Sequence, residues 1–256
     1  MKLNKHWHTV LVGAVLIGIA TFSRPAEAQV RPSFYGSGEA DTRNVQFSLV
    51  GMYLGTGDLG WTPYADINGW LLDYPIAGTP VCTAVCTSAG RQTLSAVNPT
   101  AGLAYSTANS GVSFGGGYAF VHNQAVGVPG AASGGENGVT ASFGAYRNGR
   151  GRRAANSQLL AEYNFGAQYA WARARESVPF GHSVKHPARV GLELIGQGGG
   201  KNGITSSEFD VGPTLEYAWT PNFSTTGVVG YKNVGGSGFA SRQNAGYLKL
   251  EFSYSP

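Results

Sequence analysis

The sequence is poor in charge and lacks long hydrophobic or helical patterns. Charged residues make up 12% of the 256 residues, about half the usual share. After the first 28 residues, no run approaches the roughly 20 apolar residues of a membrane-spanning helix. No segment of that part sustains a 3.6-residue hydrophobic period. With 12% aromatic residues as well, the chain is neither disordered, nor a coiled coil, nor a polytopic helical membrane protein.

Glycine and aromatic residues are what the sequence has in excess. It contains 39 Gly, 13 Tyr, 12 Phe and 5 Trp, whereas an average chain is about 7% glycine. Small polar residues fill much of the remainder. This composition favours an all-β protein.

The first 28 residues are organised like a secretory signal peptide. Lys2 and Lys5 precede an apolar run from Val10 to Phe22, and Ala26–Ala28 supplies a small-x-small cleavage pattern. We predict cleavage after Ala28 and a single mature domain over 29–256. A retained membrane anchor is the alternative.

Removing this leader changes the charge balance. The leader holds three of the 18 basic residues and one of the 14 acidic ones. The mature chain therefore has 15 basic against 13 acidic residues, close to +2 rather than the formal +4. Because no large Lys/Arg cluster follows, we expect no nucleic-acid partner.

Many segments alternate apolar and polar residues with the period of a β-strand. In Tyr247–Tyr254, Leu248, Leu250, Phe252 and Tyr254 share one face, while Lys249, Glu251 and Ser253 share the other. Similar patterns cover 159–171, 188–195 and 207–219, and weaker ones cover 44–54, 63–74, 100–107, 111–121, 138–147 and 222–233. These ranges predict about ten strands. We expect long loops at 127–138 and 196–203 and a tight turn at Thr220–Asn222.

The two faces of these strands indicate a membrane environment. The apolar faces end in aromatic pairs, which are Tyr169/Trp171, Tyr217/Trp219 and Phe252/Tyr254, while the other faces carry Gly, Thr, Ser, Asn and Gln. Strands of about 9–11 tilted residues cross a bilayer, and a sheet in lipid must close on itself. We predict an antiparallel transmembrane β-barrel of about 8–12 strands, ten being the best estimate, in the bacterial outer membrane. A soluble β-sandwich is the alternative.

Charges on the polar faces are expected to line the lumen. The candidates are Asp66, Glu162, Arg189, Glu193, Glu208, Asp210, Glu216, Lys232, Lys249 and Glu251. Since both signs are present, we predict that many pair and fill the lumen, with a narrow conducting channel as the alternative. Other arginines are placed at a rim, facing lipopolysaccharide phosphates: Arg147, Arg152, Arg153, Arg173 and Arg175.

Few residues offer chemistry. His182 and Ser183 are neighbours in a loop-like stretch, and with a carboxylate they would suit a lipid-modifying enzyme; solvated loop histidines are the simpler interpretation. Cys82 and Cys86 are predicted to form a disulfide in an exported protein. The glycine-rich stretches lack the Lys and Thr of a phosphate-binding loop. We therefore predict no catalytic residues, no cofactor and no metal site.

Scattered motifs resemble the cellulose biosynthesis protein S family, which comprises small outer-membrane β-barrels associated with bacterial cellulose production. They lie at 35–39, 47–55, 68–70, 191–198, 209–213 and 227–231. The Cys82/Cys86 loop and residues 123–137 depart from that family. The resemblance implies a non-enzymatic accessory role in assembly, export or anchoring of an exopolysaccharide. The partners would be outer-membrane lipid and lipopolysaccharide, the barrel-insertion machinery and a polysaccharide export complex.

Overall fold

The computed structural model describes residues 30–75, 91–126, 135–149, 155–181, 187–201, 204–237 and 242–256. The predicted signal peptide and the Cys82/Cys86 pair lie outside these residues. No helix in the described part of the chain has the length and apolarity to cross a membrane.

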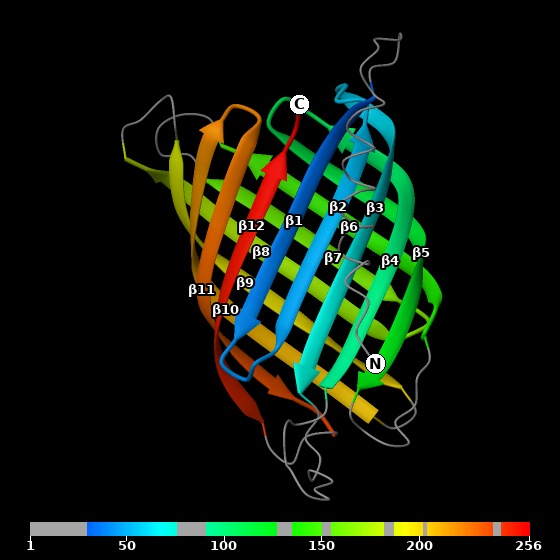
Figure 1. Ribbon diagram of the computed structural model, residues 1–256. Coiled ribbons are helices and arrows are strands. Elements are labelled where there is room, and N and C mark those ends of the chain that lie inside the picture. Colours follow the sequence, from blue (N-terminus) through cyan, green and yellow to red (C-terminus); the bar gives the residue numbers. More distant parts are fainter. Residues whose placement is uncertain are drawn as a thin grey trace, which may run out of the picture.

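The described residues form twelve antiparallel strands that close into one barrel (Figure 1). Each strand pairs with its neighbours in sequence, and β1 pairs with β12 to complete the ring. The strands are β1 (Arg31–Asp41), β2 (Gln46–Gly55), β3 (Gly60–Pro75), β4 (Arg91–Ser106), β5 (Ser110–Val126), β6 (Gly138–Asn148), β7 (Asn156–Asn164), β8 (Tyr169–Phe180), β9 (Ala188–Lys201), β10 (Ile204–Thr220), β11 (Phe223–Gly235) and β12 (Gln243–Tyr254).

The two ends of the barrel differ in their connections. Because the strand number is even, the start of β1 and the end of β12 lie at the same end, here called the terminal end (Figure 1). The opposite end, called the loop end, carries the two longest connections, residues 76–90 and 127–137. In outer-membrane barrels the longer loops are extracellular and the short turns periplasmic. The loop end is thus the end with the longer connections.

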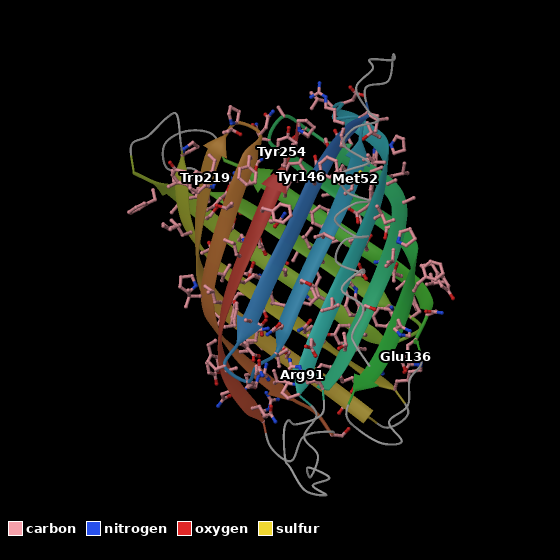
Figure 2. All side chains as sticks on the ribbon, in the orientation of Figure 1. Met52, Arg91, Glu136, Tyr146, Trp219 and Tyr254 are labelled. Carbon is pink, nitrogen blue, oxygen red and sulfur yellow. The ribbon has the colours of Figure 1, made fainter. Side chains whose placement is uncertain are left out.

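The outer wall is apolar and exposed, while the facing positions of the same strands are buried. On β12, Leu248 and Leu250 are 61% and 60% exposed, whereas Lys249 between them is 4% exposed. Figure 2 shows Trp219 and Tyr254 near the terminal end and Arg91 and Glu136 near the loop end. An apolar outside around a polar inside suits lipid, and together with closure of the sheet it rules out the soluble sandwich.

The barrel has two strands more than the ten that the sequence predicted. The segment before residue 44 forms β1, which had not been predicted. The predicted strand 159–171 is two strands, β7 and β8, joined by a turn at Phe165–Gln168. In this turn the Asn164 side chain accepts a hydrogen bond from the Ala167 N–H (3.0 Å), and Gln168 adopts a positive φ of 50°. The best estimate of ten strands was therefore two too low.

The β7–β8 turn also reverses the predicted faces. Odd-numbered residues of β7 point outward, as Tyr163 does, but odd-numbered residues of β8 point inward, because Trp171 stands opposite the inward-facing Glu162. Tyr169 and Trp171 thus belong to the lumen and not to the lipid-facing aromatics. The loop predicted at 196–203 is also wrong, since β9 continues to Lys201 and β10 begins at Ile204.

Several inward glycines make room for tyrosine rings. A Cβ atom at Gly51 would lie 2.3 Å from the Tyr35 ring, and one at Gly230 would lie 2.4 Å from the Tyr247 ring. In both places the tyrosine of one strand stands opposite the glycine of the next, and its ring occupies the space that a Cβ would fill. Such close approach is one reason for glycine inside a strand. It lets large side chains pack against a strongly curved wall.

Replacement of Gly51 by alanine should destabilise the barrel. The added Cβ would displace the Tyr35 ring, whose hydroxyl is bound to Asp66, and overpacking of this kind costs about 1–3 kcal/mol. Urea unfolding of the refolded barrel measures the loss. The control is Gly38→Ala, because no atom lies within 4 Å of a Cβ at that position. Equal stability of the two variants would contradict the role assigned to Gly51.

Candidate functional site in the barrel lumen

The middle of the lumen holds a group of five paired charges, called here the central cluster. It consists of Arg173 and Arg175 of β8, Glu193 of β9, and Lys249 and Glu251 of β12. Glu251 lies 2.9 Å from Arg173, 2.7 Å from Arg175 and 3.2 Å from Lys249. Glu193, which is fully buried, forms ion pairs with Arg175 and Lys249. Every carboxylate of the central cluster therefore has basic partners.

The central cluster connects walls that are not adjacent. β8 and β12 are separated in the sheet by β9, β10 and β11, yet Arg173 and Arg175 reach Glu251 directly. A contact between side chains of non-neighbouring strands has to cross the interior. The barrel is thus bridged by charge pairs at this level.

A second group of charges, called the Lys232 cluster, lies closer to the loop end. The Lys232 ammonium forms an ion pair with Glu39 and lies 3.0 Å from Glu208 and 3.4 Å from Asp210. Gln197 adds a hydrogen bond to Glu208 (2.7 Å). Three carboxylates thus converge on one cation. Because Glu39 is on β1 and Lys232 is on β11, this cluster spans the intervening strand β12.

Two further carboxylates in the lumen are held by hydrogen bonds. The Tyr35 hydroxyl lies 2.9 Å from both oxygens of Asp66. Asn98 of β4 donates to both oxygens of Glu162 on β7 at 3.1 Å. β4 and β7 are also non-adjacent, so the Asn98–Glu162 contact is another bridge across the interior.

The structure places all ten predicted lumen residues on the inner wall. Eight of them belong to the three groups just described. The remaining two, Arg189 and Glu216, stand opposite each other on β9 and β10. Arg189 also donates to the side chain and carbonyl of Ser177, at 3.1 and 2.9 Å.

The sequence did not predict several lumen residues of these groups, among them Asn98 and Gln197. Tyr35 and Glu39 belong to β1, which was not predicted. Arg173 and Arg175 had been assigned to a lipopolysaccharide-facing rim, and the structure corrects this because they point into the lumen. Their alternation with Ala172 and Ala174 was the available signal, since it puts arginine and alanine on opposite faces.

Arg147 is exposed at the end of β6, whereas Arg152, Arg153, His182 and Ser183 lie outside the described residues. Within the described ranges no group of three or more His, Cys, Asp or Glu side chains is arranged to hold a metal ion. The three carboxylates near Lys232 converge on its ammonium instead.

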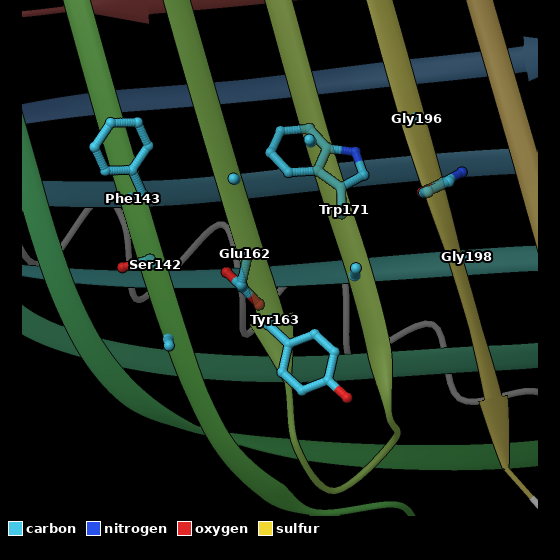
Figure 3. A pocket seen from close by; sticks show the side chains of 12 residues that line it. Ser142, Phe143, Glu162, Tyr163, Trp171, Gly196 and Gly198 are labelled. Carbon is cyan, nitrogen blue, oxygen red and sulfur yellow. The ribbon is translucent and has the colours of Figure 1, made fainter.

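The outer wall has a shallow hollow of about 470 Å³ over β6–β9 (Figure 3). Phe143 and Tyr163 line it together with small outward-facing residues, namely Ala161, Ala172 and Gly196. This lining is mostly apolar and faces lipid. The polar chemistry of the described chain is therefore concentrated in the lumen.

Comparison with known proteins supports the barrel fold. No protein-family model and no curated protein sequence matches the chain. Among solved structures, it resembles the β domain of the Bordetella autotransporter BrkA, with a TM-score of 0.52 and 12% identity over 89% of this chain and 99% of that chain. The translocator domain of the autotransporter NalP from Neisseria meningitidis (TM-score 0.47, 11% identity, 96% and 95% covered) and the KdgM porin (0.41, 11%, 87% and 98%) are also similar. The likeness to BrkA shows the fold alone, that of an outer-membrane β-barrel.

Replacing Glu251 should strongly destabilise this barrel. Glu251→Gln removes one of the two carboxylates that neutralise Arg173, Arg175 and Lys249, and breaking a buried ion pair costs about 3–5 kcal/mol. Denaturant unfolding in detergent micelles would report the change. The matched control is Glu176→Gln, since Glu176 is exposed on the outer side of β8 and should change stability by less than about 0.5 kcal/mol. A small effect at Glu251 would show that the bridge does not hold the walls together.

Proposed function

We propose that this protein is a non-enzymatic outer-membrane β-barrel whose lumen is closed by side chains. The observation that carries the proposal is the set of ion pairs and hydrogen bonds between non-adjacent strands, such as Arg175–Glu251 and Asn98–Glu162. Barrels of 16–18 strands leave an aqueous channel, and barrels of about 8 are filled by their side chains. A twelve-stranded barrel lies between these sizes. Its lumen is therefore blocked by long charged side chains that bridge the interior.

In this proposal the barrel serves as an accessory component in the assembly, export or anchoring of an envelope component. The sequence resemblance to the cellulose-associated family favours an exopolysaccharide. The long connections 76–90 and 127–137 at the loop end support contact with a partner at the cell surface. A cleaved signal peptide, a Cys82–Cys86 disulfide and contact with lipopolysaccharide, the insertion machinery and a polysaccharide export complex belong to the same proposal.

Electrical recording tests the closed lumen. The purified barrel in planar lipid bilayers should show no stable conductance steps, because the central cluster blocks the path. The double variant Arg173→Ala/Arg175→Ala should give discrete steps, while Glu176→Gln should stay silent. Gel migration with and without heating verifies that each variant is folded. Large, stable steps from the unaltered barrel would instead make it a channel.

A deletion strain tests the accessory role. We expect loss of surface exopolysaccharide, measured as glucose released by cellulase, with unchanged lipid A. Full recovery by a copy carrying His182→Ala and Ser183→Ala would exclude a catalytic role for that pair. Unchanged exopolysaccharide in the deletion strain would refute the accessory role, and altered lipid A would favour the lipid-modifying enzyme.

A further inference from the structure

Two buried oxygen atoms between the charge clusters have no hydrogen-bond partner. They are Oδ1 of Asp210 and the hydroxyl oxygen of Tyr247. Asp210 is 1% exposed and Tyr247 is 4% exposed. Buried polar groups are nearly always paired. Two unpaired oxygens on neighbouring parts of the wall therefore require an explanation.

Both residues lie close to the inward-facing position of Gly212 on β10. The Tyr247 ring lies over Gly230, and its hydroxyl lies 3.0 Å from the position of a Cβ on Gly212 of β10. Asp210 is the next inward-facing residue on β10. Glu193 of the central cluster stands opposite Gly212, and Lys232 lies 5.1 Å from the centre of the Tyr247 ring. The two oxygens thus lie where the central cluster meets the Lys232 cluster.

The charges of the two clusters do not balance. Together they contain five carboxylates, on Glu39, Glu193, Glu208, Asp210 and Glu251, but only four basic groups, on Arg173, Arg175, Lys232 and Lys249. One negative charge is left over. Burying an uncompensated charge is strongly unfavourable. The carboxylate with an unpaired oxygen is Asp210, which marks the place where one positive charge is needed.

We propose that Asp210 and Tyr247 bind a monovalent metal cation, Na⁺ or K⁺, in the lumen. The Asp210 carboxylate and the Tyr247 hydroxyl are oxygen ligands of the kind that hard cations take. A single charge completes the balance, whereas a divalent ion would exceed it. The third unpaired atom, Nε of Arg173, is a hydrogen-bond donor and is not a ligand. This site is independent of the proposed accessory role, because it needs only the folded barrel.

The experiment measures thermal unfolding of the full-length barrel in detergent. Sodium, potassium and N-methylglucamine chlorides are compared at equal ionic strength, so that general screening is the same in all samples. Binding to the folded state raises stability with ligand concentration. We expect a saturable rise of a few degrees in the unfolding midpoint with sodium or potassium and none with the organic cation.

Variants locate the site. Asp210→Asn should abolish the cation-dependent rise, and Tyr247→Phe should shift it to higher salt concentration. Glu216→Gln, a lumen carboxylate outside both clusters, should keep the full rise. Broadening of the ²³Na resonance by the folded barrel, lost in Asp210→Asn, gives a direct readout that stability alone does not.

Three results would overturn the proposal. The first is an equal midpoint of the unaltered barrel in all three chlorides. The second is an undiminished rise in Asp210→Asn. The third is a midpoint that follows pH but not the cation, which would show that a proton holds the surplus charge. None of these results bears on the exopolysaccharide phenotype, so the two proposals fail separately.

Discussion

The need to satisfy every backbone hydrogen bond without water governs this structure. In lipid an open sheet edge would leave N–H and C=O groups unpaired, so the sheet must close. The pairing of β1 with β12, from Phe34–Tyr254 to Asp41–Tyr247, performs that closure. Closure then fixes the two faces of every strand. Apolar side chains such as Leu248 and Leu250 meet lipid, and each alternate residue is directed inward whatever its polarity.

The inward face therefore collects the charge of the chain, and the barrel must stabilise it there. Ion pairs are weak at exposed surfaces but costly to break when buried. In the lumen, each carboxylate of the central cluster is shared between two or three basic groups, as at Glu193 and Glu251. Because the partners come from distant strands, the same contacts that neutralise the charges also hold opposite walls together.

Period-two alternation was sufficient to predict an all-β protein, and the low charge and the aromatic strand ends then favoured a closed barrel over a sandwich. It could not count the strands around residue 165. A four-residue turn interrupts the sheet there without interrupting the alternation of large and small residues, so β7 and β8 read as one strand. The error affected the site, since it placed Tyr169 and Trp171 on the wrong face and ended the strand at residue 171, which left Arg173 and Arg175 to be predicted at a rim. The strands β9, β10 and β12 contain no such turn, and their inward charges were placed by parity alone. The pairing of each carboxylate with a particular basic group depends on the cross-section of the barrel and on the strand register. The alternation of residues in the sequence contains neither.

The uneven distribution of charge between the two clusters has a structural consequence. The central cluster has three basic groups for two carboxylates, and the Lys232 cluster has one for three. Tyr247 lies between them, with its ring beside Lys232 and its strand neighbour Lys249 in the central cluster. A positive surplus at mid-height thus faces a negative surplus toward the loop end. The opposite net charges of the two clusters attract each other along the barrel, which adds to the cross-lumen ion pairs between β8 and β12 and between β1 and β11.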